Sequence, residues 1–282
     1  MAKIKIMTDS TCDLPASYFK EYGISVAPIN IQFGNETFEE GVSIDQTMFY
    51  KKVDALGIIP TTSQPSVGQF AELYRACAKE GYDTIISLHV TGKLSGTMNS
   101  ATLAAQEVEK EIRVLPYDSL AGSAAIGFMC VDAVKMARAG KSADQIIAAL
   151  DQKRPNARVF LTLATTKYAQ MSGRISNLQG FIATLLNVKP MVSLKDGTLA
   201  PSGRVRTRQA ALTELLELTK EAAGNNPVDF AVIHGEARAE AEQVMEKGKR
   251  MLNVRDSFID DIAISLAVHF GPGVIGTVIY PA

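Results

Sequence analysis

Hydroxyl side chains are concentrated in the stretch "PTTSQPS", which begins at Pro60. Thr62 and Ser63 offer neutral hydrogen-bonding groups. Pro60 and Pro65 stiffen the segment, which reduces the entropy lost when it is ordered on a ligand. We interpret the segment as a loop that leads into a helix starting at Val67. A loop of this composition can bind an oxygen-rich group such as an anion, although it brings no cation to the site.

A second hydroxyl-rich stretch, "KLSGTMNSA", contains Ser95, Gly96 and Thr97 at the turn into a predicted helix. Gly96 allows the backbone to approach a ligand closely, and the free N–H groups of a helix N-terminus bind anions. The stretch lacks the Gly-Lys-Ser/Thr ending of a P-loop, and "GKLSG" does not match the Gly-x-Ser-x-Gly elbow of hydrolases. It predicts either a site for a carboxylate or phosphate, or a simple helix cap.

Polar residues also follow the first predicted strand, in the stretch "TDSTCDLP". Ser10, Thr11 and Asp13 precede a helix expected to begin after Pro15, so they are suited to cap its N-terminus. They also lie at the end of a strand, where ligand-binding loops occur in parallel sheets. Capping and ligand binding both remain open at this point.

The three histidines differ in their surroundings. His89 lies in the apolar run "ISLHV", which is typical of a hydrogen-bonded core residue, and His234 ends a predicted strand. His269 precedes "GPG", a rigid loop of the kind that often carries functional residues. Because no spacing typical of zinc ligands joins any two of them, we expect no metal site.

Arginines gather in "QMSGRIS" and "PSGRVRTRQ", which we interpret as loops. The ordinary role of such side chains is solvation at the surface. Arg174, and Arg204 together with Arg206 and Arg208, could instead meet a phosphate or an acidic partner surface.

Short β-rich runs alternate with helical stretches in the first half of the chain. Strands are predicted at Lys3–Asp9, Tyr82–Val90 and Glu111–Asp118, and helices at Val67–Gly81 and Thr97–Glu111. This order indicates a parallel sheet with covering helices. The polar stretches that follow the first two strands therefore meet at the carboxyl edge of the sheet, where such folds bind ligands.

A polar, proline-containing connector near residue 155 precedes a second group of strands and helices. "KDGT" between two apolar runs predicts a hairpin, which favours a mixed or antiparallel sheet. We therefore expect an α/β protein of two domains. Residues 1–155 hold the parallel sheet with flanking helices, and residues 156–282 hold a mixed or antiparallel sheet with helices.

Composition excludes several classes of function. The 282 residues carry a net charge of −1 and are 46% hydrophobic, so the chain can bury a large core but offers no basic field for nucleic acid. Three widely spaced cysteines are typical of free buried thiols. We find no apolar run typical of a secretory signal or a stable membrane insertion. We expect a cytoplasmic monomer without a cofactor.

The neutral character of the polar stretches bears on the ligand. Hydrogen bonds from neutral donors contribute roughly 1 kcal/mol each, so strong binding needs a second source of free energy. Burial of an alkyl chain contributes about 0.8 kcal/mol per methylene, or on the order of 10 kcal/mol for about sixteen carbons. Weak polar anchoring combined with burial of a long chain describes a fatty-acid-binding protein.

Taken in order, these motifs resemble the DegV family, the fatty-acid-binding subunits of bacterial fatty acid kinase. The resemblance covers the whole chain through "TDSTCDLP", "TSQPS", "LSGTMNSA", "YDS", "SGRIS", "VKPMVSLKDGTLAP" and "HFGPGVIG". Three positions depart from the usual pattern. Ala125 and Ser172 stand where glycine is usual, and Phe270 stands where a small residue often follows the motif histidine.

The resemblance implies a bound long-chain fatty acid whose carboxylate is held by Thr62, Ser95 and His269, with its acyl chain lined by the C-terminal domain. The residues implied to support these ligands are Ser63, Gly96 and Thr97. It also implies no catalysis by the chain itself. A separate ATP-dependent kinase subunit would phosphorylate the presented carboxylate, giving an acyl phosphate for phospholipid synthesis. Arg174 and Arg204 would face the kinase or its phosphate.

Two other hypotheses belong to different classes. Ser95 and His269 could serve a stand-alone acyl hydrolase, or the chain could be a small-molecule phosphotransferase. The missing nucleophile elbow and the lack of an orienting acid count against an enzyme. A regulatory sensor would share the same lipid site and differ only in the partner that responds to the bound lipid.

Overall fold

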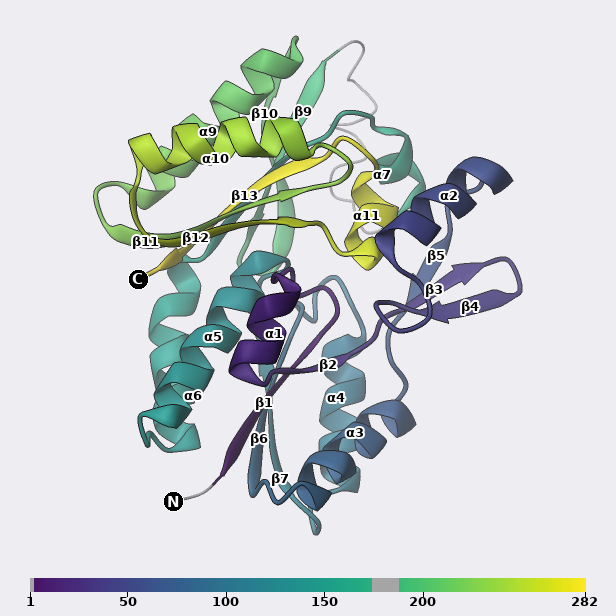
Figure 1. The fold of residues 1–282 in the computed structure, drawn as a ribbon, viewed down its shortest axis with the longest axis vertical. Coiled ribbons are helices and arrows are strands. Elements are labelled where there is room, and N and C mark those ends of the chain that lie inside the picture. Colours follow the sequence, from purple (N-terminus) through teal and green to yellow (C-terminus); the bar gives the residue numbers. More distant parts are fainter. Residues whose placement is uncertain (1–2, 174–187) are drawn as a thin grey trace.

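A four-stranded parallel sheet forms the centre of the first half of the computed structural model, which describes residues 3–173 and 188–282 (Figure 1). Its strands, in spatial order, are β2 (Ser25–Ala27), β1 (Ile4–Asp9), β6 (Thr84–His89) and β7 (Arg113–Asp118). All three neighbouring pairs run parallel. The three strands predicted for this half are confirmed, with only their ends shifted.

Helices cover both faces of this sheet, which is why β1 and β6 are buried at nearly every position. Side chains alternate between the two faces of a strand. Met7 packs with α3 (Val67–Lys79) and α4 (Thr97–Glu107), whereas Ile6 belongs to the cluster around α5 (Ala124–Arg138).

A small antiparallel sheet, in the order β4-β3-β5, lies beside the parallel sheet (Figure 1). Its elements are β3 (Asn30–Phe33), β4 (Glu36–Glu39) and β5 (Thr61–Ser63), with α2 (Gln46–Leu56) between β4 and β5. The loop predicted around Thr62 and Ser63 is therefore wrong. These residues form a short edge strand paired with β3, in which Thr62 lies opposite Ile31. The strand was not predicted because three polar residues next to a proline show no alternation of apolar and polar side chains.

The second half of the chain builds a six-stranded mixed sheet, which confirms the predicted fold class. In spatial order the strands are β10 (Thr198–Val205), β9 (Lys189–Lys195), β8 (Arg158–Thr162), β13 (Ile275–Pro281), β11 (Pro227–His234) and β12 (Asn253–Asp261). Within the described part of this sheet only β11 and β12 pair parallel, and the other neighbouring pairs are antiparallel. The predicted hairpin is confirmed at β9–β10, where Asp196 and Gly197 both have positive φ, as a tight turn of this type requires.

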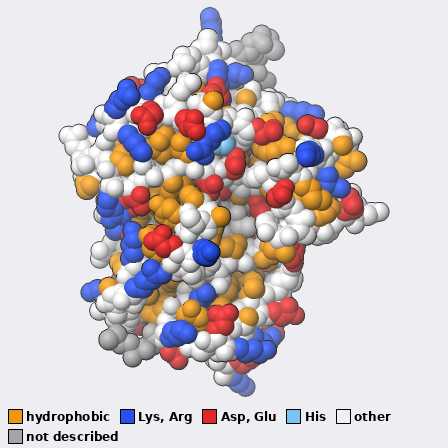
Figure 2. Space-filling view, viewed as in Figure 1, with side chains coloured by type: hydrophobic (Ala, Val, Ile, Leu, Met, Phe, Trp, Pro, Cys, Tyr) orange, Lys and Arg blue, Asp and Glu red, His pale blue; other side chains and the backbone are white. Residues whose placement is uncertain are grey.

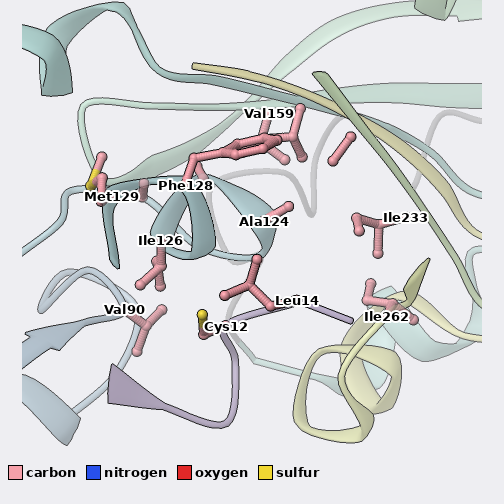
Figure 3. Packing of buried hydrophobic residues seen from close by; sticks show 14 of the residues in the cluster. Cys12, Leu14, Val90, Ala124, Ile126, Phe128, Met129, Val159, Ile233 and Ile262 are labelled. Carbon is pink, nitrogen blue, oxygen red and sulfur yellow. The ribbon is translucent and has the colours of Figure 1, made fainter. Parts of the chain in front are cut away.

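One buried cluster joins the two large sheets. α9 (Arg208–Ala223) and α10 (Arg238–Met251) cover one face of the mixed sheet. The opposite face packs on α5, where Phe128 meets Val159, and Leu14 reaches the same cluster from the turn after β1 (Figure 3). The boundary expected near residue 155 stays a prediction.

The remaining helices of the described residues are α1 (Ala16–Tyr22), α6 (Ala143–Lys153), α7 (Lys167–Met171), α11 (Ile264–Phe270) and a 3-10 turn at Arg154–Asn156. Pro15 precedes α1, and no side chain caps this helix. The interpretation of Ser10, Thr11 and Asp13 as its caps is therefore wrong, because these side chains bond to other parts of the chain.

The arginines predicted to lie on loops fall in different places. Arg204 is an exposed residue inside β10, because its backbone pairs with Pro190 of β9. Arg208 is the first residue of α9 and forms an ion pair with Glu240. Arg174 lies outside the described residues.

The surface mixes both signs of charge on the face shown in Figure 2, as the net charge of −1 leads one to expect. No helix among residues 3–173 and 188–282 is long and apolar enough to cross a membrane.

Candidate functional site

A cavity of about 70 Å³ lies where the turn after β1, strand β5, the turn before α4 and helix α11 meet. Four residues predicted from the sequence line it together: Thr62, Ser63, Ser95 and His269. The other lining residues are Thr11, Ile29, Gln64, Val90, Leu94, Leu199, Ser265, Leu266 and Phe270. The wall is therefore part hydroxyl and part aliphatic.

Ser95 lies in the turn before α4, and its hydroxyl oxygen is held by Thr97. The Ser95 Oγ accepts a hydrogen bond from the Thr97 backbone N at 3.2 Å and lies 2.8 Å from Thr97 Oγ1. Thr97 is fully buried and does not line the cavity. With Thr97 as the hydroxyl donor, Ser95 keeps its own proton for a ligand.

Gly96 brings the two hydroxyl-rich segments into contact. It is the N-cap residue of α4, and a Cβ placed on it would lie only 2.8 Å from Gln64 Nε2. The absence of a side chain at position 96 thus allows the residue after β5 to reach the turn that carries Ser95. Gly96 is not itself one of the lining residues.

In strand β5 the side chain of Thr62 points to the opposite face from those of Thr61 and Ser63. Thr61 and Ser63 hydrogen-bond to Gln32 of β3, and side chains alternate along a strand. Ser66 then starts α3 with a capping box that it forms with Gln69. Pairing on one side and the capped helix on the other fix the backbone that carries Thr62.

The turn after β1 contributes Thr11 to the cavity, and the buried carboxylate of Asp9 holds Thr11 in place. Asp9 accepts hydrogen bonds from the Thr11 backbone N at 3.1 Å and from Thr11 Oγ1 at 2.5 Å. Its other oxygen lies 3.0 Å from His89 Nδ1 and accepts from the Val90 backbone N at 3.0 Å. His89 is thus the hydrogen-bonded core residue that its apolar surroundings predicted. Burial raises the pKa of Asp9, but the hydrogen bonds from His89, Thr11 and Val90 lower it below its ordinary value.

Two further buried acids hold the start of α11, the helix that carries His269 and Phe270. Asp13 accepts a hydrogen bond from the Ala263 backbone N at 2.7 Å, and Glu40 accepts one from the Ser265 backbone N at 3.1 Å. These bonds satisfy N–H groups that a helix leaves unpaired at its beginning. Burial raises the pKa of Asp13 well above its ordinary value and that of Glu40 to about 7.

The cavity has little charge of its own. None of its described lining residues is Lys, Arg, Asp or Glu, and His269 is the titratable side chain among them. No group of His, Cys, Asp and Glu side chains that could hold a metal ion occurs in the described part of the chain. The chemistry available is hydrogen bonding by hydroxyls and contact with apolar side chains.

A second hollow of about 120 Å³ adjoins the first, because Thr62 and His269 line both. It extends over Pro60 toward Met171 and Ser172 at the end of α7. Ser172 is one of the positions that depart from the usual motif. Phe270, another of them, lies in the wall of the first cavity.

Several lining residues were not predicted. Thr11 was singled out as a possible cap or ligand residue but was not assigned to the site. Gln64 stood in the quoted stretch without a role, and Ser265 carried no local signal. Proximity to the "HFGPG" motif was the one available hint for Ser265, since it lies one helical turn before His269.

Comparison with known proteins decides the family. The model of the DegV family, whose description reads "Uncharacterised protein, DegV family", matches residues 3–282. The protein DegV of Bacillus subtilis is 31% identical over 275 residues, which cover 97% of each chain. The chain belongs to the DegV family.

Two solved structures of DegV relatives share the fold. A DegV family protein from Thermus thermophilus, described for its fatty acid binding, is 33% identical with a TM-score of 0.91, covering 99% of this chain and 100% of its own. A stearic acid-binding protein from Eubacterium ventriosum is 27% identical with a TM-score of 0.90, covering 100% of this chain and 98% of its own. The DegV family therefore includes fatty-acid-binding proteins of this architecture.

Proposed function

We propose that this DegV protein binds a long-chain fatty acid, with the carboxyl group held by Thr62 and Ser95 and assisted by His269. The observation that carries the proposal is that these three residues, from β5, the turn before α4, and α11, line one cavity. Fatty acid binding by relatives of the same architecture supports it.

The balance of free energy agrees with a lipid. Neutral hydroxyl donors hold a carboxyl group with roughly 1 kcal/mol per bond. Each methylene of the chain contributes about 0.8 kcal/mol when it leaves water. Leu94, Leu199 and Phe270 provide apolar wall next to the hydroxyls, and the mixed sheet behind Leu199 belongs to the C-terminal half.

The cavity must widen to admit the chain. Ligand pockets usually measure about 300–1,000 Å³, whereas this one measures about 70 Å³. The acyl chain therefore displaces apolar side chains of the wall, and the free energy of that rearrangement reduces the affinity.

We also propose that the bound fatty acid is presented to a separate ATP-dependent kinase subunit, which forms the acyl phosphate used in phospholipid synthesis. Arg204 supports this, because it is exposed on β10, the strand whose Leu199 lines the cavity. An exposed guanidinium suits an acidic partner surface or a phosphate. Arg174 is proposed for the same role from its place in the family motif.

Isothermal titration calorimetry with hexadecanoic acid tests the binding site. The double variant Thr62→Ala, Ser95→Ala loses about two hydrogen bonds, so we expect its affinity to fall at least tenfold. The control variant is Thr102→Ala, which removes a hydroxyl bonded to Met98 O on α4, outside the cavity. Equal affinity in the double variant and the control would contradict the assignment.

The rival acyl hydrolase has one observation in its favour, since Ser95 and His269 line the same cavity. Incubation of the protein with chromogenic esters separates the two functions. The binding function predicts no turnover above that of the Ser95→Ala variant. Turnover that the Ser95→Ala substitution abolishes would favour the hydrolase.

A further inference from the structure

The Asp9 carboxylate has no acceptor position to spare. It is completely buried and receives four hydrogen bonds, two at each oxygen. A carboxylate has about four lone-pair positions. The Thr11 hydroxyl fills one of them by donating its proton at 2.5 Å.

The groups behind Asp9 are compatible with a chain of hydrogen bonds in which Asp9 only accepts. His89 Nε2 lies 2.7 Å from Ser87 Oγ, which lies 3.0 Å from the Tyr74 hydroxyl. Tyr74 donating to Ser87, Ser87 to His89, and His89 Nδ1 to Asp9 satisfies every member of this chain. Asp9 is then an acceptor throughout, so the Thr11 proton stays committed to it.

Thr11 consequently has only lone pairs left for anything in the cavity. A hydroxyl has one proton, and Thr11 is a cavity-lining residue that is 5% exposed. Ser95 is the opposite case with Thr97 as the hydroxyl donor of their pair, because the Ser95 oxygen then accepts from Thr97 and its own proton is available. One donor and one acceptor match the C=O and O–H of a neutral carboxylic acid, whereas a carboxylate has no proton to offer Thr11.

The charges around Thr11 point the same way. The buried Asp9 carboxylate lies directly behind it. On the same turn as Ser95, Lys93 is directed to the Asp196 backbone oxygen. His269 on α11 is the titratable group of the described wall. An anionic head group would thus gain no fixed cation from the described lining residues.

We propose that Thr11 is a specificity-determining residue of the head-group site, which takes the fatty acid as the neutral carboxylic acid and accepts its proton at Thr11. The inference deepens the proposed function and rests on it.

A primary amide separates the two kinds of head group, because it carries the same donor and acceptor as the neutral acid and does not ionise. The affinities of hexadecanoic acid and hexadecanamide are measured by displacement of a fluorescent fatty acid. Because less than about 1% of a carboxylic acid with a pKa of about 4–5 is neutral at pH 7, we expect the wild-type protein to bind the amide at least tenfold more tightly than the acid at that pH. Between pH 7 and 9 the affinity for the acid falls about tenfold per pH unit, because only its neutral form binds, while the affinity for the amide stays constant.

Substitutions at position 11 test the residue itself. Thr11→Val keeps the shape and removes the hydroxyl, so the amide should bind about tenfold more weakly, the upper range for one hydrogen bond. Thr11→Ser should restore it. Thr8→Val is the matched control, since Thr8 is a fully buried threonine of β1 outside the cavity. The pH dependence for the acid should persist in His269→Gln, which excludes that histidine as its source.

Each contrary result is distinct. Binding of the acid with an affinity independent of pH, together with no binding of the amide, would show an anion site and overturn the inference. Equal amide affinities in Thr11→Val and Thr8→Val would overturn it as well. The comparison of acid and amide in the wild-type protein needs no variant, so unfolding of Thr11→Val leaves the test intact. Failure of the wild type to bind either ligand would refute the proposed function itself.

Discussion

Glu40 is a buried acid whose removal should change how stability depends on pH. Its carboxylate accepts hydrogen bonds from Ser10 Oγ at 2.5 Å and from the Ser265 backbone N at 3.1 Å. Burial outweighs these bonds and raises its pKa from 4.5 to about 7. The folded protein therefore keeps a proton on Glu40 at pH values where the unfolded chain has lost it.

The sign and size follow from proton linkage. Between pH 4.5 and about 7 the folded state binds more protons than the unfolded state at this position, so stability falls as the pH rises. The stabilisation from protonated Glu40 is complete below pH 4.5 and is lost above about pH 7. At about 1.4 kcal/mol per pKa unit, the loss amounts to about 3 kcal/mol.

Glu40→Gln keeps the shape and removes the titration. We expect the difference in free energy of unfolding, variant minus wild type, to rise by about 3 kcal/mol between pH 5 and pH 8. Urea unfolding at four pH values in this range measures it. Glu39→Gln is the control, because the Glu39 carboxylate accepts from Gln69 Nε2, and it should follow the wild-type profile. Parallel profiles for Glu40→Gln and wild type would refute the reasoning.

Three further substitutions probe the frame of the cavity. Gly96→Ala places a Cβ 2.8 Å from Gln64 Nε2. Because the Gln64 side chain can move, we expect weaker fatty acid binding in calorimetry with little change in melting temperature. An unchanged affinity would count against the contact. Asp13→Ala removes the acceptor for the Ala263 backbone N, so unfolding in urea should show a loss of about 1–3 kcal/mol, and a loss below that range would mean that water replaces the carboxylate. Phe270→Ala enlarges the cavity and should lower the free energy of unfolding by about 3–5 kcal/mol. A displacement assay should also show a higher affinity for branched chains relative to straight chains. The same preference as in wild type would place the ring away from the bound chain.

Elements with a strong local pattern were predictable from the sequence. β1 begins with Ile alternating with Lys, β6 is mostly apolar, α3 shows apolar residues at helical spacing, and the hairpin between β9 and β10 rests on Asp-Gly. The short strands β3, β4 and β5 were not predicted. They have three or four residues each, and pairing within their own small sheet, rather than an apolar alternation, defines them.

The same division applies to the site. Thr62, Ser95 and His269 came from polar motifs at the ends of predicted elements and from the family resemblance, and they do line one cavity. Of the two roles left open for Asp13, capping of α1 is wrong, and its actual partner gave no local signal because Ala263 lies 250 positions away in the sequence. Thr11 was left without a site role for a similar reason, since its importance depends on Asp9 and on the buried His89 of another strand.

The central claim is that this protein holds a fatty acid, and native mass spectrometry of the protein purified from a bacterial host tests it most directly. We predict a stoichiometric excess over the polypeptide mass, which denaturing extraction resolves into long-chain fatty acids. A bare polypeptide mass that stays bare after incubation with fatty acids would contradict the account.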